Sequence, residues 1–293
     1  MSKNSKKIIL VTGASRGVGK GIAEGIGSPG DVVICAARSL ASGTQVHQFG
    51  FELSSSLEDT VKNINQDNID ADAYVVDLNK TDEIEGLAKY VEKKYGRLDI
   101  LVHSACQIHD DLVQPKPFWE KSVNLWSIVD VGLRSNYLLS HALAPLMIKN
   151  PESLIVQISS HGASCYMHGP IYGAQKAGVD KMAFDMAHDL KEFQVCSISL
   201  WSGIVKDEKT AKVSAQHGEH YAEFLKGAAS QLFAGKVIKG IFEMDNKMKL
   251  SGKTLIAAEI GAELGITNED GSKPKSDRDT LGGPQEFNKA VIY

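Results

Sequence analysis

The sequence predicts a three-layer α/β fold, in which a doubly wound parallel sheet is covered by helices on both faces. Two observations predict it: β-branched apolar runs recur along the chain, and segments with helical periodicity separate them. Continuous apolar strands are typical of parallel sheets buried on both faces, and right-handed crossovers then place helices on each side. With 293 residues and 43% hydrophobic content, the chain has ample apolar surface for such a core.

The expected strands follow one another at regular intervals. Six apolar runs predict them at 7–12, 31–37, 72–78, 98–104, 153–160 and 194–201, and a seventh run at 253–258 closes the sheet. The polar, helix-prone segment 207–249 is the predicted substrate lid, and 250–293 supplies the last strand and a tail that reads as irregular from Asn268 to Pro284. Because no linker, repeat or low-complexity block precedes the tail, we interpret residues 1–293 as a single domain.

Composition argues against several classes of partner. A formal charge of −4, a pI near 6.1 and the absence of Lys/Arg runs argue against binding to nucleic acid or an anionic membrane. No apolar run approaches the ~20 residues that a membrane span needs, and the first strand begins where a signal peptide would have its apolar region. We expect a cytoplasmic protein. The four cysteines lie far apart with no metal-ligand spacing, so we expect reduced thiols and no metal site.

A glycine-rich turn directly follows the first strand. The stretch TGASRGVG places Gly13, Gly17 and Gly19 between that strand and a helix. Glycines allow the backbone to approach a pyrophosphate, whose charge then lies on the N–H groups at the start of the helix. This context predicts a dinucleotide site in a Rossmann fold.

The stretch YGAQK places Tyr172 one helical turn before Lys176. Residues four apart share a helix face, and a neighbouring positive charge favours the ionised phenol. By itself this pair also fits an ordinary solvated helix face. Together, the glycine-rich turn and the Tyr-x-x-x-Lys pair resemble the classical short-chain dehydrogenase/reductase family over 7–206 and 250–258. The stretches at 118–120, 131–137, 199–205 and 250–255 further resemble one subgroup of that family.

The resemblance implies an oxidoreductase that transfers a hydride between a nicotinamide and a carbonyl or secondary alcohol. It implies a catalytic set of Ser160, Tyr172 and Lys176, with Tyr172 as the acid/base, Lys176 as a ligand of the nicotinamide ribose and the serine as a donor to the substrate oxygen. Counting from the strand favours Ser160, whereas counting back from Tyr172 favours Ser159. We favour Ser160.

The same resemblance implies the cofactor contacts. These are Gly13, Ser15, Arg16, Gly17, Val18, Gly19, Arg38, Asp77, Leu78, Ser104, Ala105, Tyr172, Lys176, Gly203 and Ile204. Ala37 stands where NAD-specific relatives carry an acidic residue, and Arg38 and Arg16 offer guanidinium groups to a 2′-phosphate. We therefore expect NADP(H) to be preferred over NAD(H). For Asp77, a strand-end cap is the alternative, and the long stretch between 39 and 71 is either a cover for the adenosine or a surface excursion.

Three positions depart from the family pattern. Gly132 stands in place of the asparagine that anchors a water in the proton relay, so that Asp130, Asn136 or the backbone alone would have to replace it. Residues 103–106 read His-Ser-Ala-Cys instead of Asn-Asn-Ala-Gly, with the histidine expected as a stabilising donor rather than a base. Asp207 takes the place of a threonine that meets the cofactor, where it would either point away or weaken binding by charge repulsion.

These departures keep a second hypothesis open, a non-catalytic or regulatory NADP(H)-binding protein with the same fold. A sugar-nucleotide epimerase is disfavoured because the chain is short for an added substrate domain. We expect a small-molecule carbonyl or alcohol substrate, whose identity the sequence does not give. The family further implies a homodimer or homotetramer that pairs through the helices expected at 122–148 and 171–191.

Overall fold

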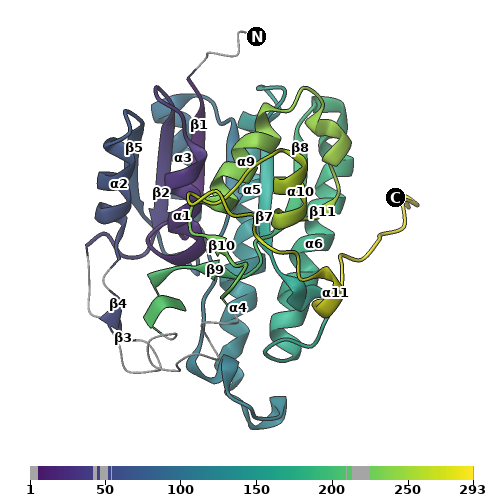
Figure 1. Cartoon of the computed structure of the whole chain (residues 1–293). Coiled ribbons are helices and arrows are strands. Elements are labelled where there is room, and N and C mark those ends of the chain that lie inside the picture. The colour runs from purple at the N-terminus through teal and green to yellow at the C-terminus, as the bar shows by residue number, and fades with distance from the viewer. Residues whose placement is uncertain are drawn as a thin grey trace.

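The computed structural model describes residues 6–41, 45–46, 52–53, 55–208, 210–212 and 225–292. A seven-stranded parallel sheet runs through the molecule in the order β11-β8-β7-β6-β1-β2-β5 (Figure 1). Its strands are β1 (Ile8–Thr12), β2 (Val32–Ala37), β5 (Asp70–Val75), β6 (Ile100–His103), β7 (Leu154–Ser159), β8 (Cys196–Trp201) and β11 (Thr254–Ile256). All seven predicted strands are confirmed, and so is the doubly wound arrangement.

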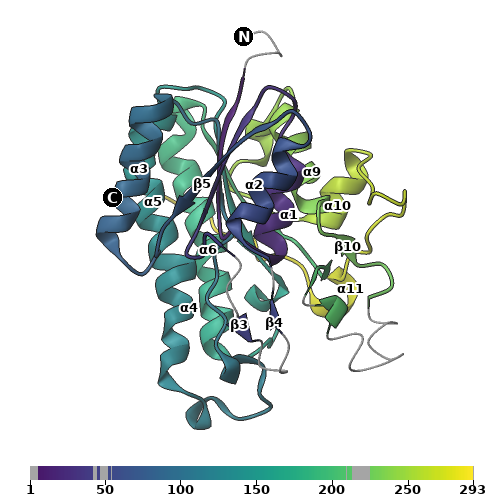
Figure 2. The same ribbon diagram turned by 90° about the vertical axis from the view of Figure 1, so that its left-hand side faces the viewer.

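Helices cover both faces of the sheet, as Figures 1 and 2 show. One face carries α1 (Gly17–Ile26), α2 (Leu57–Asn65), α9 (Phe233–Glu243) and α10 (Ala257–Glu263). The other carries α3 (Thr81–Tyr95), α5 (Ser135–Met147) and α6 (Pro170–Leu190). Two apolar cores result, and successive residues of a strand such as β1 enter them alternately. Burial on both faces explains why the inner strands read as continuous apolar runs.

The prediction was least accurate for β5, the edge strand of the sheet. The apolar run at 72–78 starts two residues late and extends past the observed end at Val75. Its side chains are only partly buried or exposed, so that Asp70 and Asp72 occupy ordinary edge positions. An edge strand needs no continuous apolar run, which is why the polar start was missed.

Part of the predicted lid segment belongs to the core. Helix α9 lies within 207–249 and packs closely on α1, with Phe233, Val237 and Ile241 fully buried. A Cβ at Gly235 would lie 2.6 Å from the Ile22 carbonyl oxygen, so the two helices approach at a distance that only glycine permits. The lid role remains a prediction for the rest of the segment, of which residues 209 and 213–224 lie outside the described part. Just before the segment, β9 (Val205–Lys206) pairs with β10 (Ala229–Ser230).

Other connections are short or irregular. Between β2 and α2, β3 (Gln45–Val46) pairs with β4 (Glu52–Leu53). Residues 42–44, 47–51 and 54 of this connection lie outside the described part, so the expected cover over the adenosine stays a prediction. Between β6 and α5 the chain passes through α4 (Ser127–Val129) and a π-helical turn, Asp130–Arg134. The tail is irregular except for α11 (Arg278–Leu281).

Two kinds of feature are absent from the described residues. No helix in this part combines the length and apolarity that a bilayer crossing demands. Within the same residues, no group of three or more His, Cys, Asp or Glu side chains is arranged to hold a metal ion.

Candidate active site

In the glycine-rich turn between β1 and α1, the absence of a Cβ at two glycines lets backbone segments approach closely. Gly13 has φ +72°, its N–H donates to the Ala36 carbonyl at 2.8 Å, and a Cβ there would lie 2.8 Å from the Ala105 Cα. A Cβ at Gly19 would lie 2.2 Å from the Gly13 carbonyl oxygen. No side-chain hydrogen bond from the N-cap residue Arg16 caps α1. The turn therefore forms a cradle whose backbone amides suit an anion.

Arg16 and Arg38 lie close enough to interact electrostatically, beside the end of β2. Burial lowers the pKa of the Arg16 guanidinium, and the positive charge of Arg38 lowers it further, while Glu208 opposes both. Two like charges held together form a natural receptor for an anion. Ala37, the last residue of β2, adds no carboxylate there.

The other predicted cofactor contacts line the same edge of the sheet. Ser15 is buried within the turn, Val18 packs against the core beneath it, and Leu78 is buried beyond β5. Asn79 donates to the Asp77 carboxylate through its backbone and its side chain, at 3.1 and 2.9 Å, so the strand-end cap is present. The Asp77 carboxylate also interacts with the charge of Arg38, so it lies near the Arg16 and Arg38 pair.

Two further loops complete the candidate cofactor cleft. The Ser104 N–H donates to the Thr12 hydroxyl at 3.2 Å, while the Ser104 hydroxyl is buried without a partner among the described residues. Gly203 has φ +70°, and the carbonyl of Ile204 accepts from the Ala229 N–H at 2.9 Å. The orphaned hydroxyl and the glycine cradle both fit a polar ligand lying across this edge.

The structure brings Ser160, Tyr172 and Lys176 together. The Ser160 and Tyr172 hydroxyl oxygens are 3.0 Å apart, and the Lys176 Nζ lies 5.5 Å from the Tyr172 ring centroid. Lys176 is 7% exposed and donates to the Ile158 carbonyl at 3.3 Å. Ser159 points elsewhere, because its hydroxyl donates to the Lys176 backbone carbonyl at 3.2 Å. Of the two serines, Ser160 is therefore the one that contacts the tyrosine.

Sequence reasoning missed Asp180, which lies one turn after Lys176 on α6. Its buried carboxylate accepts hydrogen bonds from the Ser199 hydroxyl at 2.5 Å and from the Trp201 indole N–H at 3.0 Å. Burial raises the pKa of this carboxyl, whereas those hydrogen bonds and the charge of Lys176 act to lower it. The Lys-x-x-x-Asp spacing was the available signal, since residues four apart share a helix face.

The carbonyl of Gly132, in the π-helical turn, is fully used within the protein. It accepts from the Gln175 Nε2 at 2.6 Å and from the Asn136 Nδ2 at 3.1 Å. A Cβ at Gly132 would lie 2.8 Å from the Gln175 Nε2, so the missing side chain makes room for this amide. Two donors occupy the two lone pairs of a carbonyl. Asn136 therefore lies at this carbonyl, but the carbonyl has no lone pair left to hold a relay water.

Asp207 does not point away from the glycine-rich turn. One carboxylate oxygen accepts from the Thr210 N–H at 2.8 Å, while the Thr210 hydroxyl accepts from the Asp207 N–H at 2.8 Å. The other oxygen lies 3.2 Å from the position of a Cβ on Gly17. A negative charge thus lies beside the cradle that suits an anion, a feature that does not fit a bound pyrophosphate.

Comparison with known proteins agrees with this geometry. Residues 7–218 match the family model described as short chain dehydrogenase. The chain is 31% identical to dehydrogenase/reductase SDR family member 1 of Homo sapiens, over 90% of this chain and 84% of the relative. That is the subgroup that the sequence resembled.

Two solved structures share the fold. A 3-oxoacyl-[acyl-carrier protein] reductase from Brucella melitensis, in complex with NAD, aligns with a TM-score of 0.69 at 21% identity, over 87% of this chain and 96% of its own. A single-substitution variant of actinorhodin polyketide ketoreductase, with NADPH, aligns with a TM-score of 0.71 at 21% identity, over 87% and 97%.

Proposed function

Because the chain belongs to the short-chain dehydrogenase/reductase family, we propose that it is an NADP(H)-dependent oxidoreductase acting on a carbonyl or a secondary alcohol. The observation that carries the proposal is the contact of Ser160 with Tyr172, with the ammonium of Lys176 buried one turn further along α6. These groups combine a proton donor, a hydrogen-bond donor and a fixed positive charge in one place.

The roles follow from this arrangement. In reduction, the Tyr172 hydroxyl gives its proton to the carbonyl oxygen, and in oxidation the phenolate takes a proton from the alcohol. Ser160 steadies the same oxygen through its hydroxyl, which lies within hydrogen-bond distance of the Tyr172 oxygen. The Lys176 ammonium, 5.5 Å from the Tyr172 ring centroid and held by the Ile158 carbonyl, is placed to bind the nicotinamide ribose. When bound, the nicotinamide supplies or accepts the hydride.

Two observations support NADP(H) over NAD(H). The guanidinium groups of Arg16 and Arg38 lie close enough for each charge to act on the other, and β2 does not end in a carboxylate that would repel a 2′-phosphate. The structurally similar proteins were solved with NAD in one case and NADPH in the other, so the fold accommodates either nucleotide. The guanidinium pair is therefore the feature on which the preference depends.

A screen of aldehydes, ketones and quinones with NADPH, followed by loss of the reduced-nicotinamide absorbance, tests the proposed activity. Tyr172→Phe should keep the fold and the cofactor affinity but lose ~10²–10⁴-fold in turnover, because only the proton donor is removed. Tyr166→Phe is the matched control, since Tyr166 is 81% exposed and should turn over as the wild type does. Near-wild-type turnover in Tyr172→Phe would refute the role.

A second candidate function is a non-catalytic or regulatory NADP(H)-binding protein. It is favoured by the Asp207 carboxylate beside Gly17 and by the saturated carbonyl of Gly132. This reading predicts that NADPH binds, as seen by quenching of protein fluorescence, while no carbonyl compound in the screen is reduced. Turnover of any substrate that depends on Tyr172 decides against it.

A further inference from the structure

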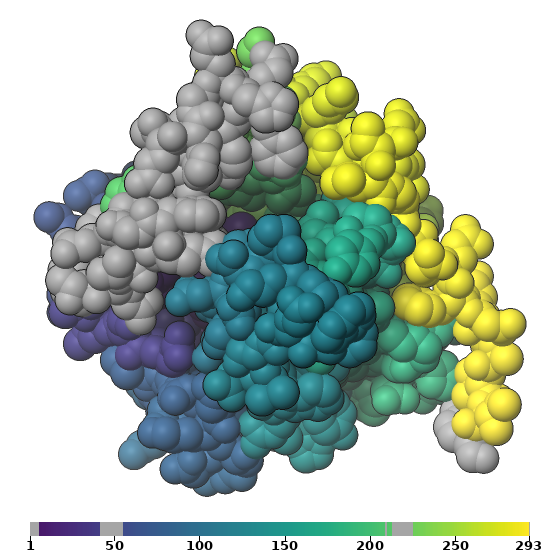
Figure 3. All heavy atoms as spheres, turned by 90° about the horizontal axis from the view of Figure 1, so that it is seen from below, coloured from purple at the N-terminus to yellow at the C-terminus, as the bar shows by residue number. Residues whose placement is uncertain are grey.

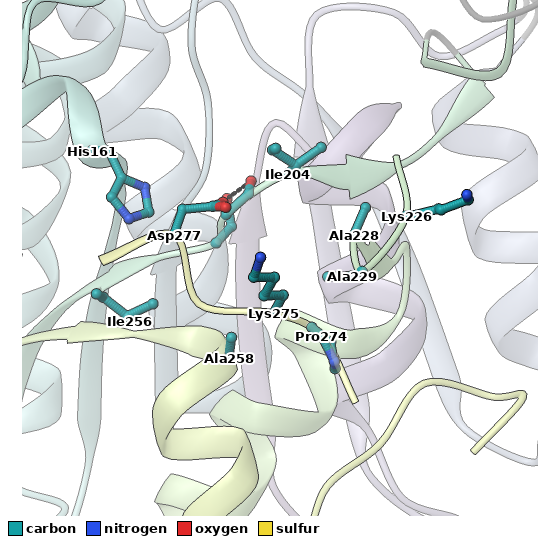
Figure 4. A pocket seen from close by; sticks show the side chains of 13 residues that line it. His161, Ile204, Lys226, Ala228, Ala229, Ile256, Ala258, Pro274, Lys275 and Asp277 are labelled. Carbon is teal, nitrogen blue, oxygen red and sulfur yellow. Dashed lines mark hydrogen bonds between the residues drawn. The ribbon is translucent and has the colours of Figure 1, made fainter. Parts of the chain in front are cut away.

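A small cavity lies at the carboxyl ends of β8 and β11, between the sheet and the C-terminal tail (Figure 4). Its volume is about 30 Å³, which suits one small polar group rather than a whole substrate. Most of its wall is apolar, formed by Ile204, Ala228, Ala229, Ile256, Ala258 and Pro274. Polar side chains also line it, those of His161, Ser202, Lys226, Lys275 and Asp277, and His161 and Asp277 lie next to each other.

The cavity adjoins the candidate cofactor site, because Gly203 and Ile204 line both, and His161 directly follows Ser160 in the chain. The imidazole is 3% exposed and stacks on Trp201 with 4.8 Å between ring centroids. Burial lowers the pKa of His161, against the opposing charge of Asp277, so the ring is neutral at pH 7. Its Nε2 has no hydrogen-bond partner in the described part of the chain. A buried, unpaired ring nitrogen is costly unless a ligand satisfies it.

Asp277 is held in place by the tail around it. The Lys275 N–H donates to the Gly227 carbonyl at 2.8 Å. On either side of Asp277, the Ser276 hydroxyl and the Arg278 guanidinium both bind Glu259, at 2.7 Å each. The Asp277 carboxylate itself makes no hydrogen bond or ion pair with any described residue. Figure 3 views the molecule from below, and there the tail, drawn in yellow, lies along one side.

The charges around the cavity select the kind of group that fits. An anionic group would meet the carboxylate of Asp277, and a cationic group would meet the ammonium of Lys275 and a neutral imidazole. Figure 4 shows His161 and Asp277 next to each other, while the amine of Lys226 points away from both. A hydroxyl can donate to the carboxylate and pair with the ring nitrogen at the same time.

We propose that His161 and Asp277 form a recognition site for a hydroxyl group on the substrate, so that the preferred substrates are hydroxylated ketones or aldehydes. The inference rests on the proposed function, since the reacting carbonyl would lie at Ser160 and Tyr172, next to His161. The tail residues 274–278 then act as a specificity wall for the same site.

Matched pairs of ketones test the proposal. Hydroxyacetone, 4-hydroxy-2-butanone and 5-hydroxy-2-pentanone are compared with acetone, 2-butanone and 2-pentanone, using NADPH and the wild-type protein. At one chain length at least, the hydroxyl should raise kcat/KM by about tenfold to a hundredfold, the usual effect of a hydrogen bond to a charged group in a buried site. Asp277→Ala should bring that ratio to near 1, and Asp279→Ala, an exposed carboxylate two residues on, should leave it at the wild-type value.

A second measurement does not require turnover. The imidazole C–H resonances of His161, identified by their loss in His161→Phe, should shift when 5-hydroxy-2-pentanone is added to the NADP⁺-loaded protein, and should not shift with 2-pentanone. If all ketones fail to be reduced but the resonances shift, the proposed function fails and the hydroxyl site stands. If ketones are reduced with no preference for the hydroxyl at any length, or if Asp277→Ala keeps the preference, the hydroxyl site is wrong.

Discussion

At the scale of single residues, burial determines whether the histidines next to the candidate site carry a charge. His103 is 1% exposed at the end of β6, and its Nε2 lies 2.8 Å from the Ser140 hydroxyl. Complete burial lowers the pKa of His103 to about 3. At physiological pH the ring is thus neutral and keeps a single N–H, so it acts as a hydrogen-bonding group and not as a charged acid.

This burial predicts a pH dependence of stability. An unfolded His103 binds a proton near the ordinary histidine pKa of 6.5, whereas the folded one has a pKa of about 3. Stability should therefore fall as the pH drops through 6.5 toward 3, by at most ~1.4 kcal/mol per pH unit from this group. Urea denaturation at pH 7, 6 and 5 should show a shallower slope in His103→Asn than in wild type. His141→Asn, at an exposed histidine of α5, should keep the wild-type slope, and equal slopes in all three proteins would contradict the explanation.

A second prediction concerns the carboxylate of Asp207. Asp207→Asn keeps an oxygen to accept from the Thr210 N–H but removes the negative charge next to Gly17. We expect NADPH to bind ~5–10-fold more tightly, as for the loss of about 1 kcal/mol of repulsion between well-solvated charges, and the gain should shrink at high salt. Fluorescence titration measures it, with Asp185→Asn on the exposed side of α6 as the control. Unchanged or weaker binding would mean that the carboxylate moves aside without cost.

At the scale of elements, the π-helical turn Asp130–Arg134 and the start of α6 fit together through one missing side chain. Gly132→Asn would push a Cβ to within 2.8 Å of the Gln175 Nε2, in a site where Gln175 is 1% exposed. We expect a loss of ~1–3 kcal/mol in the free energy of unfolding, typical of overpacking. Gly132→Asn combined with Gln175→Ala should lose less than the sum of the two single changes.

Urea denaturation of the four proteins in this cycle gives the coupling. Gly86→Ala is the control for adding a methyl group to a helical glycine, because the new Cβ at Gly86 meets only the Tyr74 hydroxyl at 3.3 Å. That variant should be neutral or slightly more stable, since alanine favours a helix over glycine. Strict additivity in the cycle would show that Gly132 and Gln175 are not sterically linked.

The sequence predicts elements better than it predicts the contacts between them. The inner strands are buried on both faces and leave a continuous apolar run, and the glycine-rich turn is local, so both are readable without a structure. Gln175 on Gly132, and Asp277 near His161, join segments that are far apart in the chain. The periodicity and motif spacing of a sequence do not predict contacts between residues so far apart in the chain. The choice of Ser160 over Ser159 as the residue that contacts Tyr172 likewise needed the orientation of the strand end.

At the scale of the whole molecule, the single-domain organisation and the homo-oligomer remain predictions. The helix expected at 171–191 is present as α6, whereas the one expected at 122–148 is divided into a 3-10 turn, α4, the π-helical turn and α5. Some apolar residues of both are used within the chain. The Leu133 side chain packs so closely on Gly178 that a Cβ there would lie 2.9 Å from it. The Phe184 ring lies 5.2 Å from the Phe287 ring in the tail. Tyr137, which is 53% exposed, is available to a partner.

Light scattering at micromolar concentration tests the assembly. We expect an integral multiple of 31.7 kDa, and Tyr137→Glu should shift the mass toward that of one chain, because a charge in an isologous contact faces its own copy. Tyr166→Glu places the same charge on an exposed tyrosine outside these helices and should not change the mass. A wild-type mass of 31.7 kDa would count against assembly.

The close fit of Gln175 over Gly132 also limits how this protein can change over evolutionary time. A chain that acquired asparagine at 132 while keeping Gln175 would be less stable, so selection for stability would remove it. The glutamine would have to shorten first, and that step leaves a buried carbonyl with one donor fewer. Each order of mutation crosses a costly step, so we expect descendants of this lineage to keep both residues or to have replaced both together.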